Sequence, residues 1–432
     1  MKRSIAVLGA VAAISLVLAG CGGSDSAESS SGPISLTLAG WSLATTPEFK
    51  TLADGFHAIH PDVTVQLKEY DANSYDTQMI ADLAAKKAPD IYVQKNLKNF
   101  YTYQSGRQLL DVSDVAKDLT DTVNGLAEYQ MDGKTYAIPY RGDSWVLYYN
   151  KALFDKADVP YPDGSWTWDD YVSTSKQITT KLKAAGSKAL GDYEHTWQST
   201  VQGFALAQTS GASLQSDDFS YLKPYYNWAL DLQDSGSQVK LGDATTNSLT
   251  YQAQFGKQQA ATMLMGTWYM ATLLSQQTSG EADQFSWGIA PAPQLTSSTT
   301  GTAATPITFG DPTGLGINPK IDKNKVAAAK AFLGYAAGKQ GAESLAKIGI
   351  TPADTDAVAA TFFELKGIPT DTLSRFAFAK HDTKPENPVA KSTPALQNIL
   401  NDLHTAVLSG SSTVDAAISE AQTRAKNEGL TK

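Results

Sequence analysis

Two charged residues, Arg141 and Asp143, stand between two apolar runs of this chain. The run before them follows a turn at Asp132-Gly133 and predicts a strand ending at Pro139, and the run after them predicts a buried strand over 145–149. Charged side chains wedged between core strands are costly to bury without partners. We therefore expect Arg141 and Asp143 to line a cleft between two lobes, where a polar ligand completes their hydrogen bonds. The alternative is that they pair with each other at a surface turn.

Tryptophan is frequent in this chain, with 8 in all, and several stand in predicted loops or at the ends of elements. A half-exposed indole offers a flat apolar face. The tryptophans therefore predict flat apolar faces for a ligand.

Strands and helices alternate in the early part of the chain, as judged from apolar periodicity and from Pro and Gly breaks. The expected elements are a strand over 35–39, a helix over 47–60, a strand over 63–67, a helix over 73–87 and a strand over 90–93. This order is typical of an α/β lobe with a mostly parallel sheet, in which ligands bind at the carboxyl ends of the strands. The rule points to Trp41 after the first strand and to Gln94 and Asn96 after the third.

The later part of the chain repeats the alternation with longer helices. The expected elements are a helix over 168–183 with Thr167 as N-cap, a helical stretch opening with 192–197, a buried strand over 263–265, strands over 287–290 and 314–317, a helix over 326–337 and helices from 395 onward. No repeat of fixed period is present.

The N-terminus predicts export. Lys2 and Arg3 precede an apolar run over 5–18 that is too short to span a bilayer, so residues 1–20 predict a secretory signal peptide. The junction LAGC resembles the lipobox of bacterial lipoproteins, which implies lipidation of Cys21 and membrane contact through it. The chain has 1 cysteine, which cannot form an internal disulfide. Residues 21–33 are small and polar and predict a flexible tether.

Length and charge narrow the class of protein. The 432 residues, less the leader and tether, exceed what one hydrophobic core usually supports, so at least two lobes are expected. The formal charge of -9 comes with no basic block, which argues against nucleic acid as a partner. His57 and His60 have no further ligands nearby in the sequence, so we expect no metal site and no cofactor. No later apolar run is long enough for a transmembrane helix.

The order of several short motifs carries a family resemblance. These are HPDVTV at 60–65, APDIYV at 88–93, QSGRQLLDVSD at 104–114, GKTYAIPYRGDSWVLYYNKALF at 133–154, SWTWDDY at 165–171, MLMGTWYM at 263–270, WGIAPAP at 287–293 and GLGINPK at 314–320. The chain resembles the extracellular solute-binding proteins of bacterial ABC importers, the group that includes maltodextrin-binding protein, over residues 34–353. Each motif is weak alone, and their shared order makes the resemblance specific.

The resemblance implies a two-lobe α/β fold of the periplasmic-binding-protein type (type II), with crossover segments near Tyr140, Ala290 and Ala337. The first lobe would comprise 34–139 plus 291–336, and the second 140–290 plus 337–432. It also implies the activity: an oligosaccharide is captured between the lobes, and the closed protein, a monomer, docks on the permease of an ABC importer at the extracellular face of the membrane.

The resemblance also nominates binding residues. Asp143 stands where the family carries an acidic sugar ligand and Trp268 where it carries a stacking Trp, while the position of Arg141 carries no sugar contact in the family and suits orienting Asp143. The second lobe would further supply an acid and an aromatic from the region of Asp192, Tyr193, Glu194 and Trp197, and we add Tyr269 and Asp311. The loop after APDIYV departs from maltodextrin binders, with Gln94 and Leu97 in place of their Trp and acid. We expect Trp145, Trp166, Trp168 and Trp228 to pack in the core.

Two other classes of protein remain open on the sequence. Paired carboxylates near tryptophans would also suit an exported glycoside hydrolase or lyase, although no HExxH, GxSxG or P-loop motif is present. An acidic pocket would suit a peptide, a polyamine or a metal ion, whereas the aromatic loops favour neutral rings.

Overall fold

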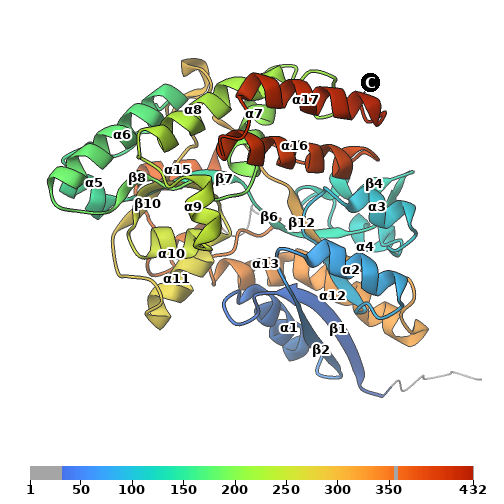
Figure 1. The fold of residues 1–432 in the computed structure, drawn as a ribbon. Helices are drawn as coiled ribbons and strands as arrows, with labels where there is room; N and C mark the ends of the chain where they lie inside the picture. Colours follow the sequence, from blue (N-terminus) through green and yellow to red (C-terminus); the bar gives the residue numbers. More distant parts are fainter. Residues whose placement is uncertain (1–31, 355–358, 432) are drawn as a thin grey trace, which may run out of the picture. The chain divides into compact units, whose positions relative to one another are not determined.

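The structure is a computed structural model that describes residues 32–354 and 359–431. The predicted leader, Cys21 and the tether as far as residue 31 lie outside the described residues. The described residues from Pro33 onward have mixed α/β structure, in which sheets are flanked by helices (Figure 1).

The first sheet has five strands in the order β2-β1-β3-β12-β6. They are β2 (Val63–Tyr70), β1 (Ile34–Trp41), β3 (Ile91–Gln94), β12 (Pro312–Ile317) and β6 (Ile138–Gly142). β1 pairs in parallel with β2 and β3, whereas β12 is antiparallel to both β3 and β6. The predicted strands 35–39, 63–67, 90–93 and 314–317 are thus confirmed to within a few residues.

Helices cover this sheet because each has an apolar stripe at helical spacing. Helix α1 (Glu48–Ile59) buries Phe49, Leu52 and Phe56, and α12 (Val326–Ala337) buries Phe332 and Leu333. The others are α2 (Tyr75–Ala84), α3 (Phe100–Ser105), α4 (Ser113–Lys117) and α13 (Lys339–Ala346), with a small hairpin of β4 (Gln130–Met131) and β5 (Lys134–Thr135). Helix α1 spans Glu48–Ile59, which confirms the helix predicted over 47–60.

The second sheet has four strands in the order β10-β7-β9-β8. They are β10 (Trp287–Ala290), β7 (Trp145–Asn150), β9 (Ala260–Gly266) and β8 (Leu190–Asp192). β8 and β9 run parallel, and β7 is antiparallel to β9. Its core is a separate cluster of buried side chains, so each sheet has its own hydrophobic core.

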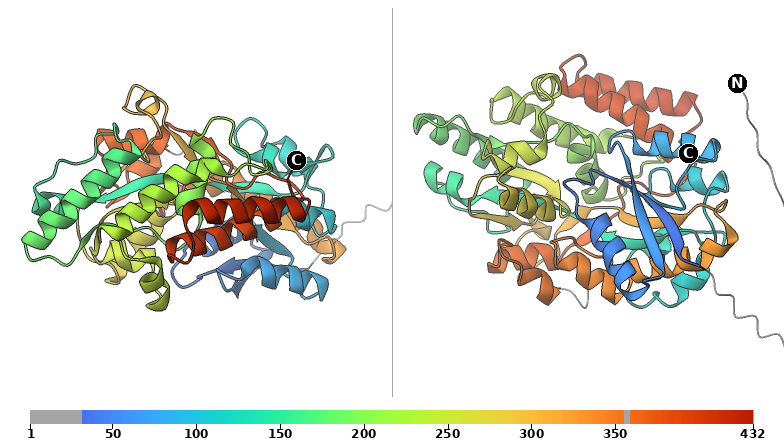
Figure 2. Two further views of the ribbon diagram at one scale, coloured as in Figure 1. Left: turned by 45° about the horizontal axis from the view of Figure 1, so that its top comes forward. Right: turned by 90° about the horizontal axis from the view of Figure 1, so that it is seen from below.

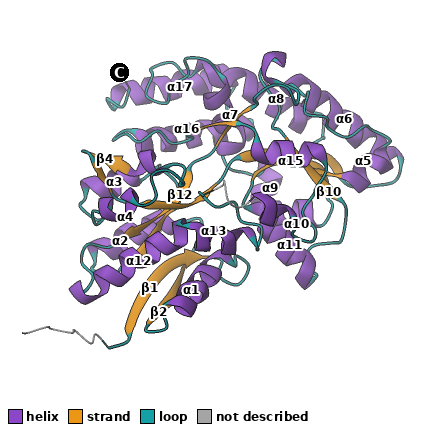
Figure 3. Cartoon of the chain, turned by 180° about the vertical axis from the view of Figure 1, so that it is seen from behind, coloured by secondary structure: helices purple, strands orange, loops and turns teal. Residues whose placement is uncertain are grey.

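Helices surround the second sheet as well (Figures 2 and 3). They are α5 (Lys151–Ala157), α6 (Trp168–Ala184), α7 (Ser199–Gln208), α8 (Lys223–Asp234), α9 (Leu241–Thr246), α10 (Tyr251–Gly256), α11 (Tyr269–Ser279), α14 (Ala359–Phe363), α15 (Thr372–Ala379), α16 (Thr393–Leu408) and α17 (Val414–Asn427). Thr167 caps α6 as predicted, in a capping box with Asp170. None of the helices in the described ranges has an apolar stretch long enough to cross a membrane.

Two predicted element boundaries are wrong. The strand before Asp143 continues past Pro139 to Gly142, because β12 pairs with it at Arg141 and Gly142 after a register shift. Asp192 ends strand β8 instead of opening a helix, and α7 begins only at Ser199. A three-residue strand beside a polar stretch gives too little periodicity to be seen in the sequence.

The return of the chain from the second sheet to the first also differs from expectation. The sequence assigns 291–336 to the first lobe, whereas Ala292 and Phe309 belong to the core around the second sheet. Phe309 in β11 (Ile307–Phe309) stacks on Trp145 with ring centroids 4.9 Å apart, and β11 pairs with β13 (Asp382–Lys384). The chain therefore enters the first sheet only at β12.

Candidate functional site

The carboxyl ends of the parallel strands place the predicted residues at the edges of the two sheets. In the first sheet β1 is parallel to β3, and both β3 and β6 are antiparallel to β12. The three strands β1, β3 and β6 therefore run in one direction, and their last residues, Trp41, Gln94 and Gly142, lie at the same edge of the sheet. In the second sheet β9 ends at Gly266 opposite Trp145, the first residue of β7. Asp143 and Ser144 join β6 to β7 and so connect these two edges.

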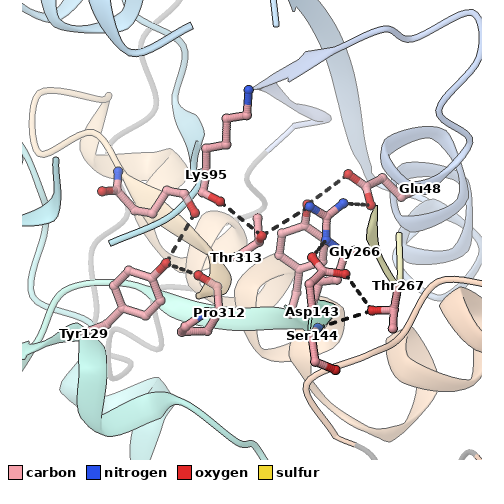
Figure 4. Close-up of polar contacts among 12 residues, drawn as sticks. Glu48, Lys95, Tyr129, Asp143, Ser144, Gly266, Thr267, Pro312 and Thr313 are labelled. Atoms are coloured by element: carbon pink, nitrogen blue, oxygen red, sulfur yellow. Dashed lines mark hydrogen bonds and ion pairs between the residues drawn. The ribbon is translucent and has the colours of Figure 1, made fainter. Parts of the chain in front are cut away.

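A compact charged cluster occupies this junction (Figure 4). Arg141 donates from Nη1 to Glu48 Oε2 at 2.6 Å and from Nη2 to Thr313 Oγ1 at 3.2 Å, while its Nε lies 2.7 Å from Asp143 Oδ2. Thr267 donates its hydroxyl to Asp143 Oδ1 at 3.3 Å. Arg141 and Asp143 do pair with each other, but in the interior and not at a surface turn, since each is 7% exposed.

Burial sets the electrostatics of the cluster. It raises the pKa of Asp143 to about 6, with Arg141 opposing the shift and Glu48 adding to it. Burial alone would lower the pKa of Arg141, but the charges of Asp143 and Glu48 outweigh it and raise that pKa. The guanidinium is therefore permanently charged, and Asp143 is ionised at neutral pH and protonated in mild acid.

Trp268 lies two residues after the end of β9, with its ring packed against Gly266. The ring also meets Trp145 edge to face, with centroids 5.6 Å apart. The absence of a side chain at Gly266 thus makes room for the indole itself. Trp268 is half-buried, so part of the residue is exposed to solvent.

Further aromatic side chains continue from Trp268 along the same edge. Burial raises the pKa of Tyr251 to about 12, and a hydrogen bond with the Trp268 side chain opposes this shift, so the two residues are in contact. Tyr251 lies 5.6 Å from Trp197 and 5.4 Å from His195, centroid to centroid. Trp268, Tyr251 and Trp197, all half-buried, form what we call the aromatic row.

The acids predicted beside Trp197 lie deeper than expected. Asp192 is fully buried and accepts hydrogen bonds from the hydroxyls of Tyr171 and Thr262. Burial raises the pKa of Asp192 to about 7 and that of Glu194 well above its usual value, where the charge of Asp192 adds to the effect. Tyr193 is fully buried and donates to the carbonyl of Leu249 at 3.2 Å. All three side chains therefore lie in the interior.

The first sheet offers a more polar edge. Trp41 packs edge to face on Phe49 and Tyr75 and is 8% exposed. Gln94 is buried, and neither its amide nitrogen nor its amide oxygen has a hydrogen-bond partner among the described residues. Asn96 is half-buried and accepts a hydrogen bond from the Lys98 backbone. Buried amides without hydrogen-bond partners are unusual, and both polar atoms of the Gln94 side chain remain available to form hydrogen bonds.

Two of the predicted site residues, Asp311 and Tyr269, make contacts within the protein. Asp311 accepts from the backbone N–H groups of Leu97, Glu386 and Asn387 and from the Asn387 side chain, at 2.7 to 3.2 Å. Tyr269 is fully buried and packs against Tyr148. Both side chains act in the structure as ties between segments.

No sequence pattern predicted Glu48, Tyr251, Thr267 or Thr313 as residues of this site. Glu48 opens α1 within the motif TPEF, and Tyr251 follows Thr250, which caps α10. An acid at the first turn of a helix is common for reasons of the helix dipole, so nothing in the sequence marked Glu48 as a partner of Arg141. Within the described ranges no group of three or more His, Cys, Asp and Glu side chains could hold a metal ion.

Comparison with known proteins agrees with this arrangement. A family model for bacterial extracellular solute-binding proteins matches residues 51–370. A putative binding protein of Brucella abortus is 24% identical over 229 residues, and the chain spans about half of that relative, 47% of its length.

Two solved structures share the fold over most of their length. A sugar transporter of Rhizobium etli in an open conformation has a TM-score of 0.72 at 28% identity, covering 92% of this chain and 99% of the other. An ABC substrate-binding protein of Listeria monocytogenes in complex with cycloalternan has a TM-score of 0.74 at 20% identity, covering 92% and 100%. Both sequence and fold therefore place this chain among the bacterial extracellular solute-binding proteins.

Proposed function

We propose that this protein captures a neutral sugar, an oligosaccharide, between its two lobes and delivers it to an ABC importer. The observation that carries the proposal is the aromatic row of Trp268, Tyr251 and Trp197 next to the buried carboxylate of Asp143. Flat apolar faces in series match successive sugar rings, and a carboxylate accepts hydrogen bonds from a pair of ring hydroxyls.

The relatives support a sugar as the ligand. The similar protein of Rhizobium etli is described as a sugar transporter, and the one of Listeria monocytogenes binds cycloalternan. The row itself favours a chain of rings over a single ring, because its outer members, Trp268 and Trp197, both contact Tyr251 between them.

In this proposal the first lobe closes over the sugar. Gln94, Asn96 and Trp41 stand at the edge of the first sheet, and the unpaired amide of Gln94 would find partners on the ligand. A ligand that contacts both lobes stabilises the closed form by its differential contacts, and the closed form then docks on the permease. The capture involves no bond breaking, and the protein acts as a monomer.

The packing of the two cores supports revised lobe boundaries. We assign 34–142 and 312–353 to the first lobe and 145–309 with the helices from α14 onward to the second, with crossings at 143–144 and 310–311. The predicted signal peptide and the lipidated Cys21 would hold the protein at the extracellular face of the cytoplasmic membrane.

Isothermal titration calorimetry tests this function. The mature protein is titrated with maltotriose, cellotriose, chitotriose and a cyclic glucan, and with glycerol phosphate, a tripeptide and spermidine as other ligand classes. We expect binding of at least one neutral sugar and no reducing ends released on overnight incubation. Binding of only a charged ligand, or cleavage of a sugar, would reject the proposal.

A further inference from the structure

We propose that Glu48, on the first sheet's side of the junction, is a positioning residue of the ligand site: it holds Arg141, and Arg141 holds Asp143. This role rests on the proposed function, since it concerns the same Asp143 that we assign to the sugar.

Glu48 is buried in an unusual way for a glutamate. It is 0% exposed although it opens helix α1, where side chains usually reach solvent. A buried carboxylate is costly unless it is paired and hydrogen-bonded. Both of its oxygens have partners on one strand, because Oε1 accepts from the Tyr140 hydroxyl at 3.2 Å and Oε2 accepts from Arg141 at 2.6 Å. Glu48 is therefore directed at β6, the strand that leads into the second sheet.

The guanidinium of Arg141 is held on three sides. Nη1 binds Glu48, Nη2 binds the hydroxyl of Thr313, and Nε faces Asp143. Thr313 in turn donates to the carbonyl of Lys95, in the loop that follows Gln94 (Figure 4). The planar fork of an Arg permits one orientation when its donors are engaged at fixed points. The contacts with Glu48 and Thr313 thus fix the direction in which Nε of Arg141 points.

Asp143 depends on this orientation. It lies in a two-residue connection between strands, so no helix or strand of its own holds the carboxylate. The Nε atom of Arg141 lies 2.7 Å from Oδ2 of Asp143, and Thr267, the neighbour of Trp268, donates to Oδ1. Because Glu48 fixes Arg141, a change at α1 should alter the carboxylate beside the aromatic row without touching the ligand.

The charges of the cluster give a readout that needs no ligand. Glu48 raises the pKa of Asp143, so removing its charge should lower the pH at which Asp143 titrates. The tyrosines that face Asp143, namely Tyr140, Tyr148 and Tyr251, stay neutral in this range because burial raises each pKa further. His381 contacts Ser144, with its Nε2 2.9 Å from Ser144 Oγ, and burial lowers the pKa of His381.

The test uses Glu48→Gln, which keeps the shape and removes the charge, with Asp54→Asn as control on the same helix. Asp54 is exposed and pairs with Lys50 at the surface, 2.5 Å away. The carboxyl carbon of Asp143 is followed by NMR during a pH titration of the full mature chain, with Asp143→Asn to assign its signal. We expect a lower titration midpoint in Glu48→Gln and an unchanged one in Asp54→Asn. An unchanged midpoint in Glu48→Gln would overturn the proposal.

A double-mutant cycle then separates positioning from general damage. With the sugar that binds the wild-type protein in the calorimetric panel, Glu48→Gln should weaken affinity about tenfold, the loss of one charged hydrogen bond. Glu48→Gln combined with Asp143→Asn should bind no worse than Asp143→Asn alone. Additive losses would overturn the positioning role.

Two arms keep the outcomes apart. If Glu48→Gln fails to fold, Thr313→Val removes the second anchor of Arg141 with little change in shape and takes its place in the cycle. If no sugar binds the wild-type chain, the proposed function fails, while the NMR midpoint still decides whether Glu48 sets the state of Asp143.

Discussion

The indole ring of Trp268 occupies the space that a side chain at Gly266 would need: a Cβ atom there would come within 1.8 Å of the ring. The two residues flank Thr267, which donates to Asp143. One short turn at the end of β9 therefore carries both the Trp268 ring and the hydroxyl that contacts Asp143.

Gly266→Ala should displace the Trp268 ring, because the added Cβ would occupy the space of the ring. We expect sugar binding to weaken about tenfold or more as a result. Calorimetry with the bound sugar and tryptophan fluorescence report the two effects. Gly242→Ala in α9 is the matched control, because nothing lies within 4 Å of a Cβ added there. Equal affinity in Gly266→Ala and the wild-type protein would show that the ring is not a platform.

Trp268→Ala should likewise weaken binding at least tenfold while leaving the chain folded, because we expect one face of the ring to contact the ligand and not the core. Trp228→Ala is a suitable comparison, since Trp228 is also half-buried but stacks on Trp168, away from the aromatic row. Circular dichroism and calorimetry on both variants distinguish loss of binding from loss of fold. Similar affinity losses in the two variants would contradict the assignment.

Asp143→Asn should remove the pH dependence of binding. Burial raises the pKa of Asp143 to about 6, so in the wild-type protein the carboxylate is lost as pH falls through 6, and sugar affinity should fall with it. The amide does not titrate, so the variant should bind weakly and equally at pH 5 and pH 8. Affinity measured at both values decides, and a wild-type affinity that rises in acid would reject the assignment.

Asp192→Asn should change how stability depends on pH. Burial raises the pKa of Asp192 to about 7 from 3.8, so the folded state binds its proton more tightly and wild-type stability falls as pH rises from about 4 to 7. The variant should lack this loss, on the order of a few kcal/mol, although Glu194 retains a share of it because burial raises its pKa too. Urea unfolding at pH 5 and pH 8 measures the difference. The prediction would be contradicted if the wild-type protein were more stable at pH 8 than at pH 5 and Asp192→Asn abolished that difference.

Asp311→Ala should destabilise the fold strongly, by about 3 kcal/mol or more, because four donors, most of them buried, lose their acceptor together. Asp415→Ala serves as control, since its pair with Lys223 is exposed and such pairs contribute about 0–1 kcal/mol. Urea unfolding monitors both. If Asp311→Ala weakens sugar binding while stability is unchanged, Asp311 is a ligand residue as the sequence suggested.

Much of the fold could be predicted because its signals are local. The helices over 48–59, 168–184 and 326–337 follow from apolar spacing and, at Thr167, from a cap. The strand β8 could not, because three residues carry no period, and the true end of β6 depends on pairing with β12, far along the chain. Non-local pairing sets strand ends, whereas helix ends are set by neighbours in sequence.

By itself the sequence determined that this is a two-lobe α/β chain, that Arg141 and Asp143 stand at the passage between the lobes, and that a tryptophan follows a buried strand at 268. Those conclusions rest on composition, periodicity and motif order, which are properties of neighbouring residues. Only the tertiary structure decided that Glu48 pairs with Arg141 across 93 positions, that Tyr251 lies between Trp197 and Trp268, and that Asp311 is already satisfied. The reason is physical: a buried charge selects its partner by distance and desolvation in the folded chain, and neither quantity exists until the two sheets have formed.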